Sequence, residues 1–150
     1  MKKLSNPLFA TCVLALLPTA ALAAEDPAKE RQDQMKTVVD SVKILVPMAK
    51  GEKPYDADAA VAAMKAINEV PDKFVALFPK GSETGHDTEA SPKIWENPED
   101  FKAKSDAMKT ASAEGIEQAG EGVDALRAVL FGKVLKTCGG CHDAYRIKKN

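Results

Sequence analysis

Two cysteines and a histidine form a CxxCH pattern near the end of the 150-residue chain, at Cys138, Cys141 and His142. This is the spacing of c-type haem attachment, in which each thiol forms a thioether with one haem vinyl group. Positions three apart are neighbours on one helix face, so both sulfurs can reach the same porphyrin edge. The adjacent imidazole can then bind the iron as the proximal axial ligand. The pattern predicts one covalently attached haem c with its iron.

Three other interpretations of the same residues stay open. A redox-active dithiol also uses Cys-x-x-Cys, but in a thioredoxin-like βαβ setting, and no strand pattern flanks this motif. A structural zinc site needs four ligands, and a histidine directly after a cysteine is unlike the usual zinc spacings. A plain disulfide is compatible with an oxidising compartment. The motif together with its context favours haem attachment over these three.

The start of the chain has the features of a cleaved export signal. Two lysines precede a mostly apolar stretch over residues 8–17, and Ala21 and Ala23 give the Ala-x-Ala form of a cleavage site. We therefore expect a signal peptide over residues 1–23 and one mature domain over residues 24–150, located in the periplasm. The apolar stretch is too short to cross a bilayer, and no second stretch approaches that length, so we expect no membrane span.

The charge of the mature chain narrows the classes of partner. Without residues 1–23, 19 basic residues stand against 22 acidic ones, a net charge of −3. A nucleic-acid-binding domain would need a basic face, so no nucleic-acid partner is expected. No general base, nucleophile or substrate pocket is readable either, so the sequence does not predict an enzyme.

The first mature segment has the pattern of a long amphipathic helix over residues 27–50. Asp26 is a suitable N-cap, Pro27 suits the first helical position, and Gly51 is a usual helix stop. Between them, apolar residues that include Met35 recur at spacings of three and four, which indicates one buried face.

A second helix and a long loop are predicted next. Asp56 or Asp58 caps the helix, and Pro71 lies inside its apolar stripe, where we expect a kink or a break before the proline. Residues 79–97 show no period and contain glycine, proline and polar residues, so they are expected to form a loop. The only tryptophan, Trp95, is expected to pin this loop to the core.

Two further helices complete the predicted fold. Asn97 and Pro98 begin the third helix, the glycines at positions 120 and 122 end it, and Asp124 is expected to cap the fourth. The inner face of the fourth helix carries Leu126, Leu130, Val134, Cys138, Cys141 and Tyr145. Four amphipathic helices without strands predict an all-α, antiparallel up-and-down four-helix bundle, with haem filling space near one end.

With these elements in place, the chain resembles the class II cytochromes c, the family that includes cytochrome c′. The resemblance rests on the terminal stretch from Cys138 to Arg146, on residues 50–56 after the first helix, and on residues 92–95 before the third. It covers essentially the whole mature chain. The family places CxxCH near the end of its fourth helix, as this sequence does.

The resemblance implies a role for Met35. In the family, this position of the first helix faces the iron opposite the histidine, and the low-spin members have methionine there. Met35 is therefore expected to be the sixth axial ligand, although a methionine on a helical stripe is otherwise ordinary core filling. Met48, Met64 and Met108 are expected to have only that packing role.

The resemblance also implies several haem contacts. Arg31 and Gln32 match a pair that lies near the haem edge, where an arginine can bind a propionate. Arg146 follows His142 by one turn and could cover the proximal side of the ring, or simply compensate the helix dipole. From the loop, Glu83 and its neighbour Ser82 are further candidates for contact with the haem.

Two functions follow from this interpretation. The first is a soluble periplasmic cytochrome that transfers single electrons through a haem ligated by His142 and Met35, with periplasmic redox proteins as partners. The alternative is a five-coordinate protein that binds nitric oxide or carbon monoxide at an open distal site. A haem-free interaction module is a third possibility, which a red holoprotein would exclude. The sequence leaves monomer and homodimer equally open.

Overall fold

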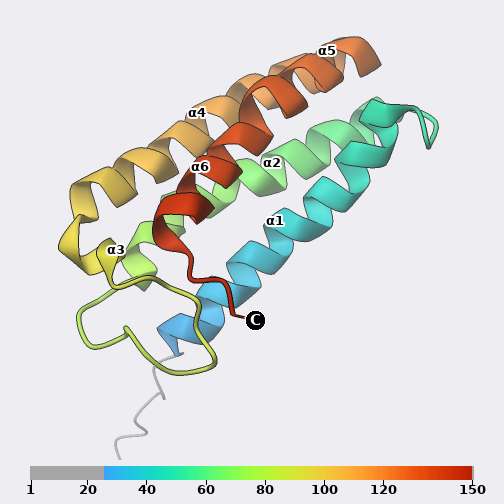
Figure 1. Ribbon diagram of the computed structural model, residues 1–150. Coiled ribbons are helices and arrows are strands. Elements are labelled where there is room, and N and C mark those ends of the chain that lie inside the picture. The colour runs from blue at the N-terminus through green and yellow to red at the C-terminus, as the bar shows by residue number, and fades with distance from the viewer. Residues whose placement is uncertain (1–25, 150) are drawn as a thin grey trace, which may run out of the picture.

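Four long helical segments run alternately up and down in an antiparallel bundle (Figure 1), which confirms the predicted fold class. The computed structural model describes residues 26–149, so the expected signal peptide over residues 1–23 lies outside the described residues. None of the described helices is long and apolar enough to cross a bilayer. In chain order the elements are α1 (Pro27–Lys50), α2 (Ala57–Phe74), η1 (Val75–Leu77), α3 (Lys93–Glu96), α4 (Pro98–Glu121), α5 (Val123–Val129), η2 (Leu130–Val134) and α6 (Leu135–Tyr145).

Most helix ends lie where capping residues predict them. The carboxylate of Asp26 accepts a 2.8 Å backbone hydrogen bond at the start of α1, and Gly51 ends that helix in the left-handed conformation, with φ of 76°. Asp56, rather than Asp58, caps α2 through a 3.0 Å hydrogen bond. The expectation for Asp124 is wrong. Gly122, with φ of 133°, is the residue before α5, and Asp124 lies within its first turn.

The region around the long loop is more helical than its composition suggests. α2 continues through Pro71 to its end and then tightens into the 3₁₀ turn η1, so no break precedes the proline. The expected loop over residues 79–97 contains the one-turn helix α3. Trp95 pins this loop as predicted, because its indole N–H donates a 3.1 Å hydrogen bond to the carbonyl of Pro79 and its ring packs against Phe78.

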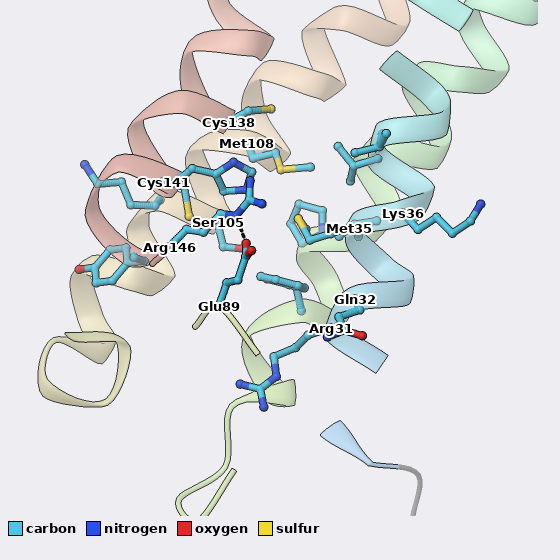
Figure 2. Close-up of a pocket in the computed structure, with 18 of the residues that line it drawn as sticks. Arg31, Gln32, Met35, Lys36, Glu89, Ser105, Met108, Cys138, Cys141 and Arg146 are labelled. Carbon is cyan, nitrogen blue, oxygen red and sulfur yellow. Dashed lines mark hydrogen bonds and ion pairs between the residues drawn. The ribbon is translucent and has the colours of Figure 1, made fainter. Parts of the chain in front are cut away.

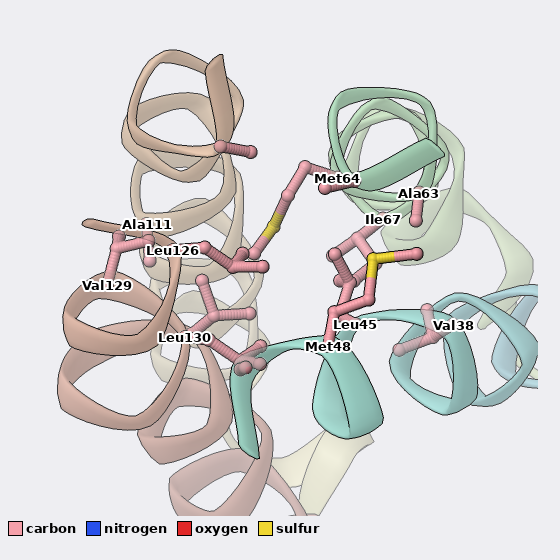
Figure 3. Packing of buried hydrophobic residues seen from close by; sticks show 14 of the residues in the cluster. Val38, Leu45, Met48, Ala63, Met64, Ile67, Ala111, Leu126, Val129 and Leu130 are labelled. Carbon is pink, nitrogen blue, oxygen red and sulfur yellow. The ribbon is translucent and has the colours of Figure 1, made fainter. Parts of the chain in front are cut away.

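The hydrophobic core lies between the four segments (Figure 3). The largest apolar side chains that are fully buried are Leu45, Met64, Ile67, Leu126, Leu130 and Val134. Burying one such side chain contributes about 1.5–3 kcal/mol to folding. Met48 and Met64 belong to this core, which confirms the packing role predicted for them.

The fourth segment contains a π-helical turn, η2, between α5 and α6. Three steps of four residues lead from Leu126 through Leu130 and Val134 to Cys138. At about 100° per residue, these 12 residues of a regular α-helix would turn Cys138 roughly 120° away from the face of Leu126. A π turn takes up one extra residue. The buried face of α5 therefore continues into the cysteine-bearing face of α6.

Candidate haem site

A cavity of about 1090 Å³ separates α1 from α6 (Figure 2). α1 packs against α5 and η2, whereas α6 packs against α3 and α4. The fourth helical segment, formed by α5, η2 and α6, therefore diverges from α1 beyond the π turn. Apolar side chains make up most of the wall, among them Val38, Val42, Val70, Phe74 and Leu135. The volume lies just above the roughly 300–1,000 Å³ that is usual for sites of small molecules and cofactors.

The structure brings most of the predicted site residues to this one cavity. α1 supplies one wall and α6, with the residue that follows it, supplies another. The predicted residues that line the cavity are Arg31, Gln32, Met35, Cys138, Cys141, His142 and Arg146. In Figure 2, Met35 lies across the cavity from Cys141 and Arg146. Residues more than 100 positions apart in the chain therefore face the same space.

The two cysteines and the histidine are neutral groups in this setting. Cys138 and Cys141 are half-buried free thiols, and burial raises the pKa of each. The His142 imidazole keeps an exposed surface, but partial loss of its hydration, followed by the charge of Arg146, lowers its pKa. A neutral imidazole has a free nitrogen lone pair, which is the form that binds a metal.

Arg31 is the most deeply buried charge at the cavity, with 4% of its surface exposed. Its Nε donates to the carbonyl of Pro27 (3.0 Å) and its Nη2 to the carbonyl of Ser82 (2.6 Å), while the guanidinium stacks 4.5 Å from the ring centroid of Phe78. Nη1 is buried without a hydrogen-bond partner among the described residues. A buried cationic donor without an acceptor is costly, so an anionic group near Arg31, which lines the cavity, would stabilise this residue.

Gln32 and Glu83 lie differently from each other. Gln32 lines the cavity and donates a 2.5 Å hydrogen bond to the loop carbonyl of His86. Glu83 does not line the cavity. Its carboxylate accepts a 3.1 Å hydrogen bond from the backbone of Gly81, and this bond lowers its pKa. Contact between Glu83 and the haem stays a prediction, whereas the neighbouring Ser82 reaches the site through its carbonyl on Arg31.

Arg146 is held by an acidic residue that the sequence did not single out. Its Nε donates to the carboxylate of Glu89, and both side chains line the cavity (Figure 2). Glu89 belongs to the long loop, whose lack of periodicity gives no register. Its proximity to Arg146 therefore had no signal in the sequence.

Met108 is the second residue that sequence reasoning placed differently. It was assigned to core packing, and it does pack against the core, but it is only partly buried and it also lines the cavity. Figure 2 shows its sulfur near Cys138, on the side of the cavity formed by α4 and α6. A second thioether is therefore available at the site, and it lies on a different wall from Met35.

These features fit a covalently bound haem better than the alternatives. The cavity has apolar walls, two thiols beside an imidazole, and the guanidinium-bearing Arg31 among its lining residues. Among residues 26–149, no three His, Cys, Asp or Glu side chains gather to hold a metal ion, which leaves a zinc site without its ligands. The described residues also form no β-strand, so the thioredoxin-like setting of a redox dithiol is missing there.

Fold and site together define a helix-bundle cytochrome of the c type. A family model described as Cytochrome C' matches residues 26–146, and the chain therefore belongs to the cytochrome c′ family. Haem c with its iron is the cofactor of this family and hence of this chain.

Several relatives are similar along nearly their whole length. Cytochrome c-556 of Agrobacterium fabrum is 38% identical over 141 residues, which cover 93% of this chain and 94% of the relative. Cytochrome c' of Rhodopseudomonas palustris is 36% identical over 132 residues, covering 87% and 88%. A solved structure of cytochrome c' from Rhodopseudomonas palustris superposes with a TM-score of 0.79 at 32% identity, covering 85% of this chain and 100% of that one.

One further solved structure is a complex with a small ligand. It is a nitric oxide complex of a cytochrome c prime variant from Alcaligenes xylosoxidans, with a TM-score of 0.73 and 34% identity, covering 83% of this chain and 96% of that one.

Proposed function

We propose that this protein is a periplasmic electron-transfer cytochrome, a low-spin member of its family, whose haem is attached through Cys138 and Cys141 and ligated by His142 and Met35. The observation that carries this proposal is that Met35 on α1 and His142 on α6 line one cavity, across which Met35 faces Cys141 of α6 (Figure 2). When haem is bound, His142 and Met35 would hold its iron from these two helices. When bound, haem c supplies one-electron chemistry between ferric and ferrous iron.

The protein's own residues have distinct roles in this proposal. The two thiols tether the ring to α6, and the neutral imidazole of His142 donates its lone pair. The thioether of Met35 is a soft, uncharged donor that favours ferrous iron and raises the reduction potential. The apolar walls exclude water, and Arg31 and Gln32, which line the cavity, would hold anionic propionates.

Replacement of each cavity methionine by leucine tests the ligand assignment. The two substitutions remove the sulfur with little change of side-chain volume, and both methionines are half-buried. We expect Met35→Leu to convert the low-spin spectrum of the holoprotein to a high-spin one, to permit rapid carbon monoxide binding and to lower the midpoint potential. Met108→Leu is the matched control and should keep the low-spin spectrum. A spectrum that is unchanged in Met35→Leu would reject Met35 as ligand.

A second candidate function is nitric oxide or carbon monoxide binding by five-coordinate iron. The nitric oxide complex of the Alcaligenes xylosoxidans relative favours it, because that protein shares the fold. In this case Met35 would be a wall residue and the distal side of the ring would be open. The wild-type spectrum separates the two functions, since a high-spin ferric spectrum with rapid carbon monoxide binding supports only the second.

We also propose that the mature protein spans residues 24–150, is exported, and meets its redox partners in the periplasm as a monomer or homodimer. The signal-like pattern of residues 1–23 supports this, as does the membership of the chain in a cytochrome family. The intact mass of the protein from a periplasmic extract tests the cleavage site and the covalent haem together. A mass that includes residues 1–23 would contradict both the cleavage site and the location.

A further inference from the structure

The loop before α3 is joined to the chain end that follows α6. The backbone N–H of Ile147 donates a 2.7 Å hydrogen bond to the carbonyl of Glu89, and the N–H of Ser91 donates a 2.9 Å bond to the carbonyl of Tyr145. Ala90 and Arg146 form an isolated antiparallel bridge between these bonds. Three consecutive loop residues are thus held against three consecutive residues at the end of α6.

This bridge brings one loop carboxylate, that of Glu89, to the side of the cavity where Arg146 and His142 lie. The side chain of Glu89 is 31% exposed and accepts a hydrogen bond from Nε of Arg146. Arg146 lies one turn after His142, and its backbone N–H donates a 3.0 Å hydrogen bond to the His142 carbonyl. Glu89, Arg146 and His142 all line the same cavity, so the charged pair lies where the imidazole lies.

We infer that Glu89 is a positioning residue for Arg146, which it holds beside His142 while offsetting the guanidinium charge. The inference rests on the proposed role of His142 as an iron ligand. The backbone bridge fixes the position of the Glu89 main chain. The hydrogen bond from Nε–H then fixes the position of the Arg146 guanidinium. Reduction lowers the charge of the iron by one, so an uncompensated positive charge near its ligand favours the ferrous state and a negative one the ferric state.

Two substitutions in the holoprotein test the opposing charges. Glu89→Gln removes the carboxylate charge but keeps an oxygen that can accept the Arg146 Nε–H, so we expect a higher midpoint potential. Arg146→Gln leaves the carboxylate unopposed, so we expect a lower one. Neither change removes a backbone bond of the bridge, because both bonds use main-chain atoms. Shifts of the same sign, or none, would overturn the inference.

A carboxylate on the same loop provides the control. Asp87 also pairs with the chain end, with Lys149 at 3.1 Å, but its side chain is 99% exposed. Asp87 lines the same cavity, but water screens its exposed charge, so Asp87→Asn should shift the potential less than Glu89→Gln does. A shift as large as that of Glu89→Gln would mean that any loop charge has this effect, and the inference would fail.

A readout that does not depend on electron transfer tests the position itself. In the reduced holoprotein, hydrogen exchange at Arg146 Nε should be slow in the wild type and in Glu89→Gln, and fast in Glu89→Ala, which offers no acceptor. Equal exchange in wild type and Glu89→Ala would overturn the positioning role.

The visible spectrum is recorded beside each measurement. A wild-type spectrum without histidine ligation defeats the proposed function, whereas an intact low-spin spectrum with unmoved potentials defeats only the role of Glu89.

Discussion

Deletion of Gly132 tests whether the π turn contains one surplus residue. Gly132 is exposed in the middle of η2 and has no side chain, so its deletion removes no buried side chain. Without it, Cys138 follows Leu126 by eleven residues, or about 1,100° of α-helix. That is only about 20° beyond three full turns. A regular helix would then keep both residues on one face.

The deletion should preserve the haem site and increase stability slightly. It removes a glycine from a helical interior, where glycine costs about 0.8–1 kcal/mol relative to alanine. It also lets the i→i+4 hydrogen bonds of an α-helix replace the i→i+5 bonds of the π turn. We expect covalent haem in the deletion variant at a yield close to that of wild type, and a thermal midpoint that is equal or higher.

Insertion of one alanine after Gly132 is the matched control. The π turn already takes up one residue, so a second surplus residue rotates α6 by about 100°. The fully buried Val134 would leave the core at a cost of about 1.5–3 kcal/mol. Cys138 and Cys141 would turn out of the cavity, so this variant should lose its haem.

Haem staining and intact mass of the periplasmic protein report attachment, and thermal unfolding reports stability. A haem-free deletion variant would refute the account of the π turn, and so would an insertion variant that carries haem normally. Either result would mean that the number of residues between Leu126 and Cys138 does not determine which face of α6 is turned toward the cavity.

Two further predictions concern packing and pH. Gly115→Ala should destabilise the protein by up to about 2 kcal/mol in chemical denaturation, because its Cβ would lie 2.8 Å from the sulfur of the fully buried Met64. Gly120→Ala is the control, because its Cβ would meet open space, and it should stabilise the protein by about 0.5–1 kcal/mol. Equal effects of the two substitutions would contradict this explanation. The hydrogen bond to Asp100 (2.5 Å), followed by burial, raises the pKa of Tyr145 to about 12. The folded state favours the neutral phenol, so Tyr145 makes its full contribution to stability below the unfolded-state pKa of about 10. This contribution should be lost as the pH rises from about 10 to about 12. Tyr145→Phe should show a shallower decline over that range, and equal slopes would contradict the shift.

The helices could be predicted because their signals are local. Asp26 and Gly51 delimit α1 through bonds within one turn, and an apolar stripe is visible in any window of a dozen residues. The same reasoning failed at Asp124, because Gly122 already allows the sharp change of direction and leaves the aspartate inside the helix. It missed the π turn as well, although the repeated spacing of four residues before Cys138 was its visible sign.

The walls of the cavity could be predicted only in part. Met35 and His142 were assigned to opposite sides through resemblance to a family, since helical period alone cannot distinguish a residue that lines a cavity from one that fills the core. Met108 shows this limit, because it occupies an ordinary stripe position in α4 and still lines the cavity. Which stripe residues line a cavity depends on where neighbouring helices separate, and that is a property of the whole bundle.

The polar contacts of the site depend on the loop rather than on the helices. The loop supplies the Ser82 carbonyl to Arg31 and the Glu89 carboxylate to Arg146, and so restrains a cation from each wall of the cavity. Gln32 is held in the same way by a loop carbonyl. The helices thus determine which groups can bind the ring and its iron, and the loop determines where the nearby charges lie. A loop without periodicity gives no register in sequence, so the residues that restrain these charges emerge only from the folded chain.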